Sequence, residues 1–545
     1  MSSVHRFAVD DDRDLDDLVA GLAARGGLQP DLDRVVDRTV YDTFDWRLWR
    51  RGSRLEHEVV VPERGRSSPR GVATPWLVWR DVDRGEVLGR LPVSQVPTFA
   101  AHLPPGPTAD RLAEVVEMRA LLPLVTVRSR HVGLALLDAE GKTLARVLID
   151  RATADGDAAL TTVAEVVPVR CYPNPAERMT ELLAAQVVLR PVENDAVDQA
   201  LARAGYHPGG YSSKLALALH PEAPALDAVV DVVATLFATM AANLEGTRAD
   251  TDSEFLHDFR VAVRRTRSVL GMATEVVPPA LLDHLRAEYK WLGDITTPTR
   301  DLDVYLLDFD DFEAAVGPDR RRHLASLRSF LVERQRRAQH DLVVALDSDR
   351  YAALVDQVSG WLADPRAEPG ATDPDVVPRA AEPAPQLAAE RTWKAYRRLV
   401  RDGRRITPES PAVRLHDLRK DAKKLRYALE CFGSLFDPDE IALGVKELKG
   451  VQDVLGTFQD CEVQKASLAE LGAELIDERG ASQAATLLAM GALVDQLDER
   501  EATARAAFAD RFARFDDPEV RARFRRLFGP HGDARADHGH PDGAA

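Results

Sequence analysis

The sequence predicts an α+β protein of several domains, in which an antiparallel β region is followed by an all-helical region. Up to about residue 215, short segments alternate polar and apolar side chains between glycine-containing turns, which is typical of antiparallel strands. From residue 221 onward, apolar residues recur with the period of a helix and strand signals become rare. At 545 residues the chain has room for three or four domain-sized units.

The elements follow in that order. We expect strands near residues 36–41, 55–61, 76–82, 125–137 and 145–149, with helices near residues 14–25 and 175–185. The helical region is predicted to span residues 221–515 as two repeats, residues 221–363 and 387–515, joined by a flexible connector rich in Pro and Ala at residues 364–386. Residues 529–545 have little to bury and are expected to be a disordered tail.

Composition narrows the classes of function. The chain has 71 Lys and Arg against 88 Asp and Glu, a net charge of −17, which argues against a general nucleic-acid coat. Its three cysteines, Cys171, Cys431 and Cys461, are far apart and indicate neither a disulfide scaffold nor a cysteine-rich zinc site. No secretory signal is expected, because the segment MSSVHRFAVDDDRDLDD has no apolar core. No membrane span is expected either, because the apolar stretch near residues 225–244 contains Asp227 and Asp231. We therefore expect a cytoplasmic protein without a membrane partner.

An internal repeat is the strongest signal in the chain. The segment HDFRVAVRRTRSVL at residues 257–270 recurs as HDLRKDAKKLRYAL at residues 416–429, an offset of 416 − 257 = 159. The same offset relates Lys290 to Lys449. Two related matches at one ungapped offset indicate that the helical region contains two copies of one unit.

Each copy of the repeated segment predicts a helix with one apolar and one basic face. At about 100° per residue, Phe259 in the first copy and Leu418 in the second lie on the apolar side, where each would anchor its helix. The opposite side and its flanks are basic, formed by His257, Arg260, Arg264, Arg265 and Arg267 in the first copy and by His416, Arg419, Lys420, Lys423, Lys424 and Arg426 in the second.

A basic face of this kind predicts an anionic partner. Ordinary surface helices alternate acidic and basic residues, whereas these faces have almost no acidic relief. They also offer no Asn or Gln for reading base edges and no interleaved aromatic residues for stacking on bases, which disfavours a specific nucleic-acid reader. Inorganic polyphosphate fits best as the partner. Further basic residues could extend the track: Arg328, Arg334, Arg336, Arg337, Lys394, Arg397, Arg398 and Arg401.

The two histidines could instead indicate a metal-dependent phosphohydrolase. That chemistry needs several converging ligands, and no second histidine lies at helical ligand spacing from His257 or His416. We expect both to donate hydrogen bonds to phosphate or to fix neighbouring groups, and we predict neither a metal site nor a bound cofactor there.

The repeated motifs resemble those of the CHAD family, the conserved histidine α-helical domain. The likeness covers about residues 221–515 and includes KWLGDITTPTRDLDV and ELKGVQDVLGTFQD downstream of the two copies. The resemblance implies two helical bundles related by a pseudo-twofold, with basic helices that bind polyphosphate and, in some members, recruitment to polyphosphate granules. It also implies that Lys290 and Lys449 belong to the binding surface. In the second copy Gln459 stands where the first has Arg300.

Residues 1–215 are similar to the CYTH family, a triphosphate tunnel fold that hydrolyses or cyclises triphosphate-containing substrates inside an antiparallel barrel. The likeness rests on VYDTFDWRLWRRG at residues 40–52, LDAEG at residues 137–141, LID at residues 148–150 and YSSKL at residues 211–215. The family's ExExK signature holds a divalent metal through carboxylate oxygens. Here Ser2, Val4 and Arg6 occupy those positions, and Glu56 and Glu58 replace an expected basic pair. A triphosphate that enters the tunnel is therefore expected to meet carboxylates, and the sequence predicts a degenerate domain. A remnant of the site could persist in Arg128, Arg130 and Asp150.

The sequence thus predicts a polyphosphate-binding protein that targets or scaffolds without turnover. One alternative is a phosphohydrolase of triphosphate or polyphosphate, in which Glu56 and Glu58 would hold the metal. A second alternative is a nucleic-acid-binding module that uses the same basic faces. The oligomeric state is left open.

Overall fold

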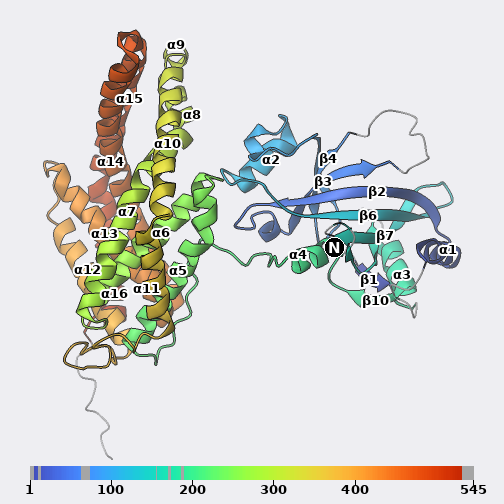
Figure 1. The fold of residues 1–545 in the computed structure, drawn as a ribbon, viewed down its shortest axis with the longest axis horizontal. Helices are drawn as coiled ribbons and strands as arrows, with labels where there is room; N and C mark the ends of the chain where they lie inside the picture. Colours follow the sequence, from blue (N-terminus) through green and yellow to red (C-terminus); the bar gives the residue numbers. More distant parts are fainter. Residues whose placement is uncertain are drawn as a thin grey trace, which may run out of the picture. The chain divides into compact units, whose positions relative to one another are not determined.

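The computed structural model describes residues 5–9, 14–62, 74–154, 156, 158–169, 173–185 and 189–530. It divides into two compact units, Met1–Ser213 and Lys214–Ala545 (Figure 1). The first contains an antiparallel sheet and the second is helical, which confirms the predicted combination of folds. Residues 531–545 of the expected tail lie outside the described residues, as do Ser2, Val4 and Cys171.

The N-terminal unit is built on one antiparallel sheet of ten strands. The strand order is β10-β1-β9-β7-β6-β2-β3-β4-β5, with β8 paired to β7. The long strands β2 and β6 pair along most of their length and curve through the middle of the sheet (Figure 1). The strands are β1 His5–Val9, β2 Gln29–Asp42, β3 Ser53–Val61, β4 Trp76–Asp81, β5 Val87–Pro92, β6 Leu122–Leu137, β7 Thr143–Ala154, β8 Ala158–Ala159, β9 Val163–Pro168 and β10 Leu189–Val192.

Alternation along β2 and β3 directs charged side chains to one face of this sheet. Residues two or four apart in a strand lie on the same face of that strand. Arg34 and Arg38 therefore share a face of β2. In the same way, Arg54, Glu56 and Glu58 share a face of β3. The helices of the unit are α1 Leu15–Gly26, α2 Pro107–Val116, α3 Pro173–Ala184 and α4 Ala196–Arg203.

Within residues 214–530, the regular elements of the C-terminal unit are all helices. Its longest helices, α14 and α15, lie side by side as an antiparallel pair (Figure 1). The helices are α5 Ala225–Arg248, α6 Ser253–Met272, α7 Pro279–Leu307, α8 Phe309–Ala315, α9 Pro318–Arg321, α10 Ala325–Leu346, α11 Asp349–Ala363, α12 Ala384–Gly403, α13 Ala412–Phe432, α14 Pro438–Arg479, α15 Ala484–Phe515 and α16 Pro518–Phe528.

The helix boundaries repeat at the offset seen in the sequence. The pairs α5 and α12, α6 and α13, α7 and α14, and α10 and α15 each begin 159 residues apart, as 384 − 225 = 159 illustrates for the first pair. A β-bridge joins Pro224 to Pro383, two residues separated by the same 383 − 224 = 159. The repeated motif therefore reflects a repeated arrangement of helix starts.

The two repeats share hydrophobic cores rather than folding as separate bodies. Phe259 and Leu418, the predicted anchors, are 0% and 1% exposed. Cys431 and Phe432 at the end of α13 pack into the core formed by α5, α6 and α7. Cys461 of α14 packs against the end of α7 and the start of α10. Both cysteines are buried and free.

The segment predicted to be a flexible connector is instead packed against the first repeat. Ala371 and Val377 are each 4% exposed. The carbonyl oxygens of Ala380 and Glu382 accept hydrogen bonds from backbone N–H groups at the start of α5, and the N–H of Arg379 donates to the carbonyl of Glu275. The prolines of this segment prevent a regular helix or strand, and the backbone hydrogen bonds hold the segment in place.

Among the described residues, one helix, α5, is long and apolar enough to cross a membrane by length and composition. Core helices of globular proteins pass the same test, and α5 contributes Val229, Val232, Val233 and Leu236 to the core of the helical unit. We therefore describe α5 as a core helix of this unit.

Candidate anion-binding site

The two motif helices, α6 and α13, are held side by side in the helical unit. Asp252 caps the N-terminus of α6, and its side chain accepts hydrogen bonds from the backbone N–H groups of Glu254 and Phe255. Farther along α6, Arg265 donates two hydrogen bonds, of 3.0 and 2.8 Å, to one oxygen of Glu430 on α13. The basic faces of the two helices consequently lie close together.

A hollow of about 570 Å³ opens between α6, α12 and α13. Eight of its lining residues are basic and one, Asp421, is acidic. We call this hollow the basic cavity; its charged residues are Arg264 and Arg267 from α6, Arg391, Lys394 and Arg398 from α12, and Lys420, Asp421, Lys423 and Lys424 from α13.

Half of the cations in the basic cavity have a carboxylate partner. Arg398 and Lys424 share Asp421 at 2.9 and 3.4 Å. Lys420 pairs with Asp417 at 3.1 Å, and Arg391 pairs with Glu275 at 3.3 Å. Across the described part of the chain, the other four form no ion pair: Arg264, Arg267, Lys394 and Lys423.

Lys423 shows the electrostatic consequence of this arrangement. Burial lowers the pKa of its ammonium group to about 8, and the nearby charges of Arg419 and Arg264 contribute to the decrease, against a weaker opposite effect of Asp460. The free protein thus holds positive charges together without enough negative charge beside them, which an anionic ligand would supply.

Five of the thirteen residues predicted from the sequence line the basic cavity, and eight do not. Arg260 is the clearest departure, since its guanidinium turns toward α7 and donates to the carbonyl of Gly293 and to the hydroxyls of Thr296 and Thr297 at 2.7–3.2 Å. Burial, followed by repulsion from Arg264, lowers its pKa to about 10. It therefore ties α6 to α7 instead of facing the cavity.

The expectation that the basic faces have almost no acidic neighbours is wrong for much of the second copy. The backbone periodicity placed these residues on one side, but acidic side chains from α13 and α14 reach them. His416 bonds to Glu462, Arg419 lies 3.0 Å from Asp460, and Arg426 lies 2.5 Å from Glu430. Arg265 is likewise paired across the repeats with Glu430.

The predicted lysines of the longer helices lie away from the basic cavity. Lys290 is exposed and pairs with Asp294 at 2.7 Å. Lys449 is exposed and forms no ion pair with any described residue. Of the wider basic track, Lys394 and Arg398 line the cavity, whereas Arg334, paired with Glu474 at 2.7 Å, and Arg328, paired with Asp310 at 3.2 Å, do not.

Sequence reasoning placed Lys394 and Arg398 of α12 in an extended basic track but missed Arg391 of the same helix. Arg391, Lys394 and Arg398 share one face of this helix, because they are three, four and seven residues apart. At the equivalent places in the first repeat, 159 residues earlier, α5 has Val232, Thr235 and Thr239. The spacing of the three cations can be read from the sequence. Only the packing of α12 beside α6 and α13 shows that the three side chains line the same cavity.

His257 lies in a group that could hold a metal ion. Potential ligand atoms of Glu254, His257 and Asp258 all lie within 4.8 Å of one another. Glu254 also lies 3.9 Å from Arg300, which donates to the carbonyl of Ser253. His257 and Asp258 already interact with other groups of the protein, so this cluster carries no metal assignment.

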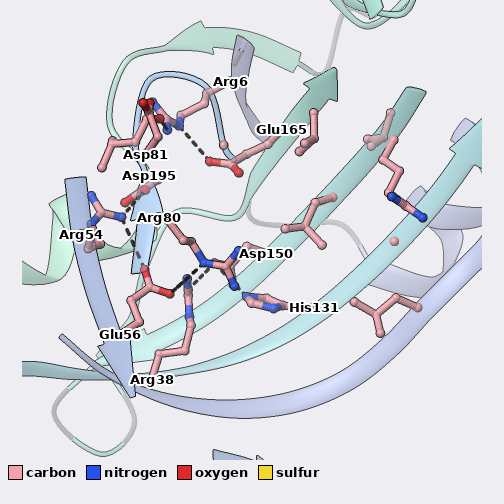
Figure 2. Close-up of a pocket in the computed structure, with 18 of the residues that line it drawn as sticks. Arg6, Arg38, Arg54, Glu56, Arg80, Asp81, His131, Asp150, Glu165 and Asp195 are labelled. Carbon is pink, nitrogen blue, oxygen red and sulfur yellow. Dashed lines mark hydrogen bonds and ion pairs between the residues drawn. The ribbon is translucent and has the colours of Figure 1, made fainter. Parts of the chain in front are cut away.

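The N-terminal unit contains a second polar hollow, of about 580 Å³ (Figure 2). We call it the sheet cavity. Arg128 and Arg130, expected as remnants of a site, do not line it: they pair with Asp37 and Asp33 at 2.7 and 3.0 Å on the exposed side of β6. Asp150 does line it, together with His131 and seven arginines: Arg6, Arg34, Arg38, Arg54, Arg80, Arg90 and Arg146.

Glu56 of the sheet cavity is more deeply buried than two of the arginines of that cavity. The side chain of Glu56 is 3% exposed, whereas those of Arg34 and Arg80 are 27% and 31% exposed. Glu58 does not line the cavity and is bound by Arg34 and Arg80. The expectation that an entering anion would meet Glu56 and Glu58 is therefore wrong, because guanidinium groups cover both.

Comparison with known proteins identifies the helical unit. Residues 231–469 match the family model of the CHAD domain, so the C-terminal unit contains a CHAD domain. The chain is 28% identical over 288 residues to the uncharacterized protein Rv2226 of Mycobacterium tuberculosis, a match that covers 50% of this chain and 53% of that protein. The chain thus spans about half the length of the curated relatives it matches.

The solved structures that are similar to this chain include the following two. The CHAD domain from the plant Ricinus communis is 26% identical with a TM-score of 0.46, and the match covers 55% of this chain and 95% of that one. PptA from Streptomyces chartreusis is 19% identical with a TM-score of 0.41, covering 53% of this chain and 99% of that one.

Proposed function

We propose that the helical unit binds inorganic polyphosphate in the basic cavity, and that this binding targets or scaffolds the protein without turnover. CHAD domains are associated with polyphosphate binding, and residues 231–469 form such a domain. Association with polyphosphate granules in the cytoplasm is the cellular consequence of this proposal.

One observation carries the proposal. Arg264, Arg267, Lys394 and Lys423 come from three helices to one hollow, and none has a carboxylate partner among the described residues. Placing like charges together in a partly desolvated hollow is unfavourable. A ligand with several negative charges relieves this repulsion and gains charge-assisted hydrogen bonds from the same groups.

The lining favours phosphate groups over nucleic-acid bases. Arginine and lysine supply every charged donor, and Asn and Gln are absent from the lining residues that the structure describes. Tyr427 is the one aromatic residue among them, which leaves no series of rings on which successive bases could stack. Binding through point charges also implies an affinity that decreases as salt is added.

Titration of polyphosphate against the full chain and a double charge reversal tests the proposal. The variant carrying Arg264→Glu and Lys423→Glu should lose about 100-fold or more in affinity, because each lost charged contact is worth about 1.5–3 kcal/mol. Its helicity should stay near that of the parent, since neither side chain belongs to the core.

A matched control separates the cavity from the net charge. Lys290→Glu with Lys449→Glu changes the net charge by the same amount at exposed positions outside the basic cavity. We expect this control to weaken binding by less than about threefold, because salt screens the long-range repulsion between the added charges and the ligand. Equal losses in the two variants would contradict the proposed site. Displacement of bound polyphosphate by RNA at similar charge concentration would favour a nucleic-acid-binding module instead.

A further inference from the structure

The sheet cavity of the N-terminal unit points to a site that works without a metal. The resemblance to triphosphate tunnels implies a divalent ion held by carboxylates, so the carboxylates of this cavity decide whether such an ion fits. In Figure 2 the labelled acidic side chains each face an arginine or lie beside one. Their distances show how fully they are engaged.

The buried carboxylates are counter-ions of arginines. Glu56 lies 3.6–3.9 Å from three guanidinium groups, those of Arg38, Arg54 and Arg80. Asp150 accepts a hydrogen bond of 2.5 Å from Arg38. Burial opposes ionisation of Asp150, but Arg38 and His131 hold its pKa below the usual range, so it remains a carboxylate. A divalent ion would have to displace these guanidinium groups.

The position of the family's signature lysine leads to the same conclusion. Arg6 stands there, and its guanidinium pairs with Glu165 at 2.8 Å and donates to the carbonyl of Val82 at 3.0 Å. Arg54 in turn forms ion pairs with Asp195 and Asp198, at 2.5 and 2.6 Å. These carboxylates are therefore occupied by cations of the protein itself, and the residues present do not fit a metal ion.

Some of the more exposed arginines of the cavity have little or no carboxylate neutralisation, whereas the exposed lining acid Asp31 already pairs with Arg146 at 2.6 Å. Arg90 is exposed, lies over the ring of Trp76 at 4.3 Å and forms no ion pair with any described residue. Arg34 has only a 3.4 Å contact with Glu58. Burial lowers the pKa of Arg34, and repulsion from Arg80, Arg90 and Arg38 adds to this effect against the attraction of Glu58. An anion at this point would relieve that crowding.

We propose that the sheet cavity binds a compact oxyanion directly through Arg34, Arg80 and Arg90, without a divalent metal, while Glu56 and Asp150 hold the guanidinium groups in place. Arginine presents fixed, paired N–H donors that match an oxyanion and needs no metal to neutralise it. The site is separate from the basic cavity, so its test is independent of polyphosphate binding by the helical unit.

Calorimetric titration with inorganic pyrophosphate tests this site. The protein is the full chain carrying Arg264→Glu and Lys423→Glu, which removes the basic cavity's contribution, and the buffer contains EDTA. We expect saturable binding that added Mg²⁺ does not strengthen. Arg90→Gln should weaken it about tenfold without disturbing the fold, because Arg90 has no ion-pair partner to leave behind among the described residues.

Arg128→Gln serves as the control, since it removes an exposed arginine on the same sheet outside the cavity. It should leave pyrophosphate binding unchanged. The inference is overturned if pyrophosphate fails to bind, if binding requires Mg²⁺, or if Arg90→Gln and Arg128→Gln have the same effect. It is also overturned if electron paramagnetic resonance detects bound Mn²⁺ that Glu56→Gln removes.

Discussion

Arg267 and Arg426 occupy equivalent positions of the repeated helix, 426 − 267 = 159 residues apart, but they differ in their partners. Arg426 pairs with Glu430 at 2.5 Å, whereas Arg267 forms no ion pair within the described part of the chain. The residue equivalent to Glu430 is Gly271, at 430 − 159 = 271. The absence of one carboxylate therefore leaves the first repeat with a cation available in the basic cavity.

Restoring that carboxylate should weaken polyphosphate binding. Gly271→Glu places an acid four residues after Arg267, as Glu430 follows Arg426, and adds a negative charge to the cavity lining. A side chain fits there, because nothing lies within 4 Å of a Cβ at this position. We expect affinity to fall about tenfold, from loss of one charged contact.

Gly271→Gln is the matched variant for this experiment, because it has the same shape without the charge. Titration of both variants with polyphosphate should show the large decrease for the glutamate alone. Affinities that are the same for Gln and Glu would show that Arg267 contributes no electrostatic contact.

Polyphosphate binding should weaken as pH rises above about 8. The pKa of Lys423 in the free protein is about 8, lowered by burial, Arg419 and Arg264. Bound phosphate favours the ammonium form and so raises this pKa, which means that binding takes up a proton at alkaline pH. Affinity is therefore full below the free pKa and decreases above it, by up to about tenfold per pH unit.

Titrations at constant ionic strength between about pH 7 and about pH 9 measure this dependence. Lys423→Arg keeps the positive charge across the whole range and should give a nearly flat profile. A profile that falls equally steeply in the parent and in Lys423→Arg would assign the effect to another group.

Phe259 should be essential for the stability of the helical unit. It is 0% exposed in the core between α5, α6 and α7, so Phe259→Ala leaves a cavity and should lower the free energy of unfolding by about 3–5 kcal/mol. Leu488→Ala removes a side chain that is 75% exposed and should change it by less than about 0.5 kcal/mol. Urea unfolding followed by circular dichroism compares the two, and similar losses would contradict the assigned core.

The sequence was sufficient to predict the repeat and the buried face of each motif helix. Both follow from local periodicity, and Phe259 and Leu418 are buried as that periodicity requires. The free or paired state of each cation was not predictable in the same way. Glu430 lies on the same helix as Arg426, but Asp460 reaches Arg419 from α14, 41 residues away in the sequence. Such pairings depend on how the helices pack.

The sheet cavity shows the same limit for strands. Glu56 and Glu58 are two residues apart in β3, and alternation places them on one face of the strand. Their neighbours across the sheet, Arg38 and Arg80, come from β2 and β4 and become visible only with the strand order and register. Without those partners, the sequence predicts that the two acids repel an entering anion.

Lysine footprinting tests the central claim most directly. Acetylation of the full chain with and without polyphosphate, read by mass spectrometry, reports the accessibility of each lysine. Lys394 and Lys423 line the basic cavity without ion-pair partners among the described residues, and we expect polyphosphate to protect both several-fold. Lys290 and Lys449, outside the cavity, should stay reactive. Protection of Lys290 and Lys449 with Lys394 and Lys423 unchanged would contradict the account.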